Sequence, residues 1–244
     1  PLIDNPLLKR LVSRWTARRQ GFDGYFPVYD FPLQHLHLMD HCSKKWDFNP
    51  GAFDCPSIVD ILRQTNTPAE FLTYPMPEEQ VFAGCQAGLR AGRARFYFLY
   101  LTMIDALGHA HGPLGAPLLE QLGWYDEQLQ ALLATAEDSG YDADMYLFSD
   151  HGMVETQRTS DLKRQIEAAG LRFGRDYVAV YDSTMARFWY LQPECRPAIE
   201  ERLHADGCGR ILSEDEKRRY GIDFAGRRFG ETIYLLPAGT VFSP

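Results

Sequence analysis

Two short clusters of aspartate and histidine have the residue types and spacing that suit metal chemistry. The first cluster contains Asp105 and His109, and the second contains the adjacent residues Asp150 and His151. Carboxylate oxygen together with imidazole nitrogen, without a thiolate, suits zinc or another borderline divalent cation. Each cluster offers two ligands, whereas a catalytic zinc takes three from the protein, so further ligands have to come from elsewhere. Two such ions roughly 4 Å apart could hold the oxygens of an in-line displacement at phosphorus or sulfur.

Each cluster directly follows an apolar run that is typical of a buried strand. Residues 96–104 are apolar or aromatic almost throughout, which indicates a central parallel strand, and residues 144–148 indicate the next one. Between them, residues 117–138 carry apolar side chains at helical spacing and are followed by Gly140. This order predicts a βαβ unit. Ligands of such sheets bind at the carboxyl ends of the strands, so we expect both clusters on one rim.

Two glycines and a third histidine lie close to these clusters. We expect Gly108 and Gly152 to let the backbone turn sharply, so that His109 and His151 point inward. His111 follows the first cluster by two residues, and from a loop it could swing in to contact a substrate.

The remaining elements follow from periodicity and from turn residues. The two strands between residues 177 and 191 are joined through Asp182 and Ser183 and are expected to form an antiparallel pair. The other predicted elements are an amphipathic basic helix at 5–20, helices at 57–63, 160–169 and 197–204, and strands at 70–73 and 232–236.

Length and composition are sufficient for one large α/β core, or for one core with a small appended lobe. The chain has 244 residues, of which 45% are apolar and 24% are charged. We expect residues 1–244 to form a single partial domain, with an irregular cap-like excursion at 21–55 and a small α+β lobe at 155–230. His35, His37 and His41 lie in that excursion without a clear pattern of acidic neighbours, so we do not assign them to a metal.

The charge balance restricts the class of partner. There are 25 basic and 33 acidic residues, giving a net charge of −8, which disfavours a nucleic acid polymer or an anionic membrane as partner. No apolar run is long enough to span a bilayer, and no secretory signal pattern opens the chain. Five cysteines without CxxC spacing argue against a disulfide framework, so we expect a cytoplasmic protein. The sequence does not indicate an oligomeric state.

The stretches from Tyr100 to Pro113 and from Leu147 to Met153 resemble the alkaline phosphatase superfamily. They are most similar to its type I phosphodiesterase / nucleotide pyrophosphatase branch. The likeness covers residues 56–154 and extends more faintly to the segment that begins at Gly230. It implies an α/β fold with a doubly wound, mainly parallel central sheet flanked by helices and a small α+β lobe.

The same resemblance implies roles for the clustered residues. Asp105 and His109 would hold one divalent ion and Asp150 and His151 a second, with zinc expected and manganese or magnesium as alternatives. In that branch a late histidine completes the first site, and an early aspartate and a nucleophilic Thr or Ser complete the second. We do not find these groups in the chain, so we expect the nucleophile to lie outside it. Ser57 lacks the Gly-rich turn expected around that nucleophile and is expected only to open a helix.

For the complete protein, these expectations amount to metal-dependent hydrolysis of a small phosphate ester, of the phosphodiester or nucleotide pyrophosphate type. One alternative is a phosphoglycerate mutase-type phosphotransferase, which shares similar Asp and His clusters. A sulfatase-like enzyme is disfavoured because no Cys-x-Pro-x-Arg motif is found. Another alternative is a catalytically incomplete metal-binding or interaction domain, because the reactive hydroxyl is missing.

Overall fold

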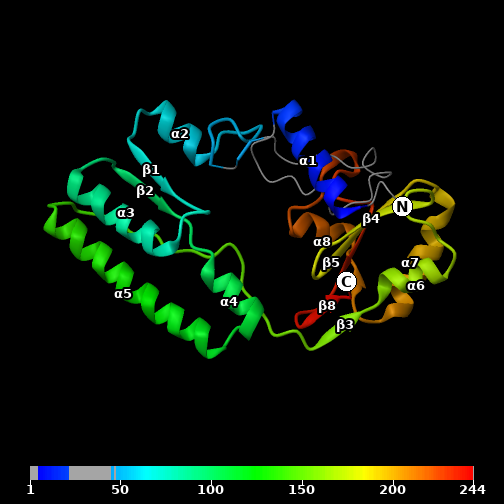
Figure 1. The fold of residues 1–244 in the computed structure, drawn as a ribbon. Helices are drawn as coiled ribbons and strands as arrows, with labels where there is room; N and C mark the ends of the chain where they lie inside the picture. The colour runs from blue at the N-terminus through cyan, green and yellow to red at the C-terminus, as the bar shows by residue number, and fades with distance from the viewer. Residues whose placement is uncertain (1–4, 22–44, 47, 244) are drawn as a thin grey trace. The chain divides into compact units, whose positions relative to one another are not determined.

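The chain contains both helices and strands and divides into two units (Figure 1). The computed structural model describes residues 5–21, 45–46 and 48–243. The first unit comprises residues 1–153 and the second residues 154–244. His35, His37 and His41, and most of the expected excursion at 21–55, lie outside the described residues. No helix in the described ranges has the length and apolar character to cross a membrane.

The first unit contains five helices and a short parallel sheet among its described residues. The sheet contains two strands, in the register Ala69↔Phe96 to Leu72↔Leu99. The helix predicted at 117–138 is confirmed with nearly the predicted bounds. In chain order the elements are α1 (Pro6–Gln20), α2 (Ile58–Gln64), β1 (Ala69–Leu72), α3 (Glu78–Ala91), β2 (Phe96–Leu99), α4 (Met103–His111) and α5 (Ala116–Asp138).

Side chains alternate between the two faces of the β1–β2 sheet along each strand. One of these faces packs on helices. Leu72 and Leu99 lie on this face and pack with Val81 and Phe82 of α3. Helices α3 and α5 lie side by side on this face (Figure 1), where Phe82 meets Trp124 edge-on at 5.3 Å. Phe71 and Phe98 lie on the opposite face and contact the ring of Phe48.

The close approach of α3 to the sheet depends on glycine. A Cβ atom at Gly88 would lie 2.7 Å from both the Glu70 carboxylate and the Tyr97 ring. Arg93 holds that carboxylate, because its Nε donates to Glu70 Oε1 at 2.6 Å. A larger residue at position 88 would therefore separate α3 from the strands.

The prediction of a strand at residues 144–148 is wrong. This segment is neither strand nor helix, and Tyr146, Leu147 and Phe148 are 83%, 76% and 75% exposed. An apolar run indicates burial, but a strand forms only where its backbone groups find a partner. In the described residues β2 pairs with β1 alone, so the βαβ unit is β1–α3–β2. The strand expected over 96–104 is also shorter, because α4 begins at Met103.

The second unit is a small α+β arrangement around an antiparallel sheet of order β4-β5-β7-β6. The antiparallel pair predicted between residues 177 and 191 is confirmed, with Tyr177 opposite Tyr190. Strands β3 and β8 form a separate parallel pair. The elements are β3 (Arg158–Ser160), α6 (Leu162–Ala168), β4 (Tyr177–Tyr181), β5 (Met185–Tyr190), α7 (Arg196–Asp206), β6 (Arg210–Ile211), α8 (Glu214–Arg219), β7 (Thr232–Leu235) and β8 (Thr240–Phe242), with short 3₁₀ turns at Pro193–Cys195 and Ala225–Arg227.

The core of the second unit lies between this sheet and helices α6 and α7. Alternate residues of β5 are buried, as expected for a strand with one covered face. Phe188 packs with Leu162, Ile166, Ile199 and Leu203, all of which are buried. The α/β class predicted from the sequence is confirmed.

Candidate functional site

The first Asp–His pair lies on one face of helix α4. Asp105 is in the first turn of α4 and His109 is four residues later, so helical geometry places the two side chains beside each other. His109 Nε2 lies 3.4 Å from Asp105 Oδ1, and both side chains are largely exposed to solvent. The sequence interpretation placed this motif directly at the end of a strand, whereas the structure places it on a helix that starts four residues beyond β2.

The second pair lies in a segment without helix or strand that leads to the end of the first unit. His151 Nε2 lies 3.8 Å from Asp150 Oδ2, and the His151 backbone N–H donates to Asp150 Oδ1 at 3.0 Å. The Ser149 hydroxyl donates to the His151 carbonyl oxygen across the bend at Asp150. The side chains of Asp150 and His151, the two candidate metal ligands, are both exposed.

Gly108 of α4 contacts Met153, two residues beyond His151, but the two Asp–His pairs do not form one cluster, because no three such side chains come together in the described residues. A Cβ atom at Gly108 would lie 2.6 Å from Met153 Sδ and 3.4 Å from Leu118 Cδ1. Helix α4 therefore packs directly against the residues that follow His151. The sharp turn expected at Gly108 is wrong, because Gly108 is inside helix α4, whereas the turn expected at Gly152 stays a prediction. Gly108 instead provides space for Met153.

The carboxylate oxygen and imidazole nitrogen of each pair are atom types that bind a divalent metal, and their separation suits two ligands of one ion. Each pair, however, supplies only two ligands. Each pair presents one oxygen and one imidazole nitrogen within 4 Å of each other, as two ligands of one ion would be. Within residues 5–21, 45–46 and 48–243, no group of three or more His, Cys, Asp or Glu side chains lies close enough together to hold a metal ion. Any ion bound at either pair would need further ligands.

Sequence reasoning missed Glu78, a buried carboxylate that fixes the start of α4. Its Oε1 atom accepts hydrogen bonds from the backbone N–H groups of Thr102 at 2.7 Å and Met103 at 2.9 Å. Its Oε2 atom accepts from the Tyr125 hydroxyl at 2.7 Å and from Gln121 Nε2 at 3.2 Å. Burial, together with this carboxylate, raises the pKa of Tyr125, which keeps the phenol protonated as a donor.

Ser57 and His111 have positions that bear on their expected roles. Ser57 opens α2, as the sequence predicted, and it does so in a capping box in which its hydroxyl donates to Asp60 Oδ2 at 2.7 Å. His111 is on α4 two residues beyond His109, and residues spaced by two do not share a helix face. A substrate contact by His111 stays a prediction.

Comparisons with known proteins identify similar chains. A family model described as type I phosphodiesterase / nucleotide pyrophosphatase matches residues 24–218. Ectonucleotide pyrophosphatase/phosphodiesterase family member 1 from Mus musculus and from Rattus norvegicus are each 38% identical to this chain over 65 residues. That stretch covers 26% of this chain and 7% of either relative.

Solved structures of ectonucleotide pyrophosphatase / phosphodiesterase 5 share the fold. The human protein matches with a TM-score of 0.60 and 16% identity, over 77% of this chain and 56% of its own. The murine protein matches with a TM-score of 0.63 and 16% identity, over 87% and 60%. An inactive murine variant in complex with AMP matches with a TM-score of 0.62. This chain thus spans little more than half of those structures, and the likeness shows an alkaline phosphatase-like α/β fold.

Proposed function

Because this chain belongs to the type I phosphodiesterase / nucleotide pyrophosphatase family of the alkaline phosphatase superfamily, we propose that the complete protein hydrolyses phosphate esters of the phosphodiester or nucleotide pyrophosphate type. The observation that carries this proposal is that both Asp–His pairs, the candidate metal ligands, lie in the first unit. Asp105 and His109 share a face of α4, and α4 packs through Gly108 on the segment that carries the second pair.

The family is generally dependent on divalent metal ions, and the paired donors are the residues proposed to hold them. Asp105 and His109 would hold one ion and Asp150 and His151 the other, with zinc as the first candidate and manganese or magnesium as alternatives. Bound ions of this kind stabilise the negative charge that develops on phosphoryl oxygens. The residues of this chain would hold and orient the two ions. The attacking Ser or Thr hydroxyl is proposed to come from outside these 244 residues.

A small nucleotide-like phosphate ester is the proposed substrate. The murine relative that was solved with AMP supports a nucleoside monophosphate as one part of it. The chain carries a net charge of −8, so an anionic substrate needs a local source of positive charge, which bound cations would supply. No nucleic acid polymer is proposed as a partner.

Zinc content tests the proposed donors directly. We expect the chain carrying Asp150→Ala and His151→Ala to retain about half of the zinc bound by the wild type, because one of two donor pairs is lost. Elemental analysis after dialysis against a zinc buffer measures this. The matched control is Asp161→Ala with His204→Ala, which removes one exposed residue of each type from the second unit. Equal zinc in all three proteins would refute the assignment.

A non-catalytic metal-binding or interaction domain is the second candidate for this chain taken alone. The observation that favours it is the lack of any three-donor group in the described part of the chain. Because the attacking hydroxyl is proposed to lie outside this chain, release of p-nitrophenol from bis(p-nitrophenyl) phosphate with added zinc is measured on the complete protein, where it separates the two candidates. Turnover that the Asp150→Ala and His151→Ala substitutions abolish supports the hydrolase, whereas zinc binding without turnover supports the second candidate.

A further inference from the structure

Helix α4 lacks an N-terminal cap of its own. The first N–H groups of a helix have no partner within it, and a side chain at the preceding residue commonly accepts from them. Thr102 stands at that position and its side chain makes no capping hydrogen bond. The Glu78 carboxylate takes this role, because it accepts from the Thr102 and Met103 N–H groups. The cap of α4 is thus supplied by α3.

The environment of Glu78 suits a buried carboxylate. The residue is 8% exposed, and burying a carboxylate is unfavourable unless hydrogen bonds replace its water. Four donors do so, two at the start of α4 and two on α5. Glu78 is also the first residue of α3, so the carboxylate lies near the positive ends of two helix dipoles.

These bonds connect the sheet to the proposed metal donors. Helix α3 is fixed on the strands through the close approach at Gly88. From α3, Glu78 fixes the first residue of α4, and Asp105 follows Met103 by two residues on the same turn. The position of the α4 N-terminus therefore determines where Asp105 and His109 lie.

We propose that Glu78 is a positioning residue for the Asp105–His109 pair, acting through the α4 N-terminus rather than touching metal or substrate. This inference rests on the proposed function, because it takes Asp105 and His109 to be metal ligands. Tyr125 and Gln121 support the carboxylate from α5, so the three helices act together in orienting the donors.

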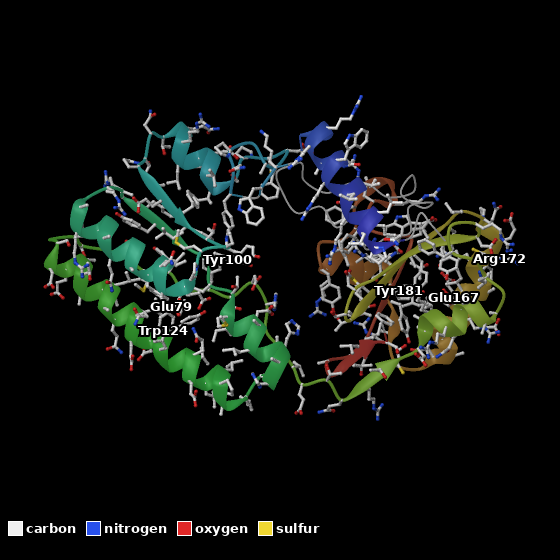
Figure 2. All side chains as sticks on the ribbon, in the orientation of Figure 1. Glu79, Tyr100, Trp124, Glu167, Arg172 and Tyr181 are labelled. Carbon is white, nitrogen blue, oxygen red and sulfur yellow. The ribbon has the colours of Figure 1, made fainter. Side chains whose placement is uncertain are left out.

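Cobalt(II) binding to the full 244-residue chain tests the proposal, because its visible absorption reports both affinity and ligand geometry. We expect Glu78→Gln to weaken binding about tenfold or more, as loss of groups that orient metal ligands does. The matched control is Glu79→Gln, which makes the same charge change at the next residue. Glu79 is exposed on α3 and is labelled in Figure 2. The control is expected to bind cobalt as the wild type does.

Further variants separate a positioning role from a general loss of folding. Affinity is compared at a temperature where far-ultraviolet circular dichroism of each variant equals that of the wild type. Tyr125→Phe removes only one donor to Glu78 and is expected to weaken binding by a smaller factor than Glu78→Gln does. If Glu78→Gln does not fold, Tyr125→Phe decides the matter, and wild-type affinity and spectrum in that variant would overturn the proposal.

An Asp105→Ala variant in the same titration distinguishes failure of the inference from failure of the proposed function. If Asp105→Ala binds cobalt as tightly as the wild type does, this pair holds no metal and the function proposed for it fails. If Asp105→Ala weakens binding while a folded Glu78→Gln does not, the metal pair stands and the positioning role of Glu78 is overturned.

Discussion

Glu78 and Glu79 are neighbours in the sequence, yet only Glu78 is buried. Nothing in the local pattern separates them, because both are acidic residues in the first turn of a helix, where either is favourable. The difference comes from Thr102, Gln121 and Tyr125, which are 24 to 47 residues away in the sequence. The types and pairing of the candidate donors could be predicted from the sequence, whereas the residue that fixes their helix depends on tertiary contacts.

Asp176 allows a test of pH dependence at a single residue. Its buried carboxylate accepts from Arg175 Nη2 at 2.6 Å and from the Arg172 N–H at 2.8 Å. The Arg175 side chain first, and then the Arg172 N–H, lower the pKa of Asp176. A lowered pKa contributes stability that is complete above the unfolded-state value of about 3.9 and is lost as the pH falls through the folded-state value.

We therefore expect Asp176→Asn to lower the free energy of unfolding at pH 7, with a difference from the wild type that shrinks towards pH 3. Urea denaturation at both pH values measures this. The control Asp223→Asn changes an exposed carboxylate for which no such difference is expected. A difference that grows on acidification would contradict the assigned role.

At the scale of elements, a helix or strand could be predicted where its own residue pattern was enough to specify it. Helix α5 was predicted because its apolar spacing extends over 23 residues. Helix α3 was not predicted, because Gly84 and Gly88 are poor helix formers within its pattern. The segment 144–148 has the composition of a buried strand, but composition does not specify which edge it would pair with.

Hydrogen exchange tests the state of that segment. We expect the backbone amides of residues 144–148 to exchange almost as fast as those of an unfolded peptide, because they are exposed and outside any strand. The amides of Phe98 and Tyr100 should be protected, since N–H groups two residues apart point to the same neighbouring strand and that of Tyr100 donates to the Leu72 carbonyl oxygen at 3.0 Å. Peptide-resolved mass spectrometry measures both regions in one experiment. Equal protection in the two regions would mean that residues 144–148 are paired as a strand.

At the scale of the molecule, each unit has its own core. In the second unit, Leu162, Phe188 and Ile199 are fully buried among side chains of that unit. A 91-residue unit with such a core is large enough to fold independently. The four described cysteines, Cys55, Cys85, Cys195 and Cys208, are free, so no disulfide among them supports either core. A cytoplasmic location stays a prediction.

We therefore expect residues 154–244, produced alone, to unfold in one cooperative transition and to keep the helical content of α6 and α7. Circular dichroism during thermal and urea unfolding measures this. The control is the same fragment with Phe188→Asp, which places a charge in the core and is expected to abolish the transition. A fragment that shows no transition would contradict the independence of this unit.

The boundary between Met153 and Val154 leaves all four candidate donors on one side of it. During evolution, the second unit could be replaced or remodelled without altering any of these donors. The first unit cannot be remodelled in the same way, because a single deletion there could remove all four candidate donors. Among descendants of a common ancestor, residues after 154 should therefore diverge faster than the neighbourhood of α4.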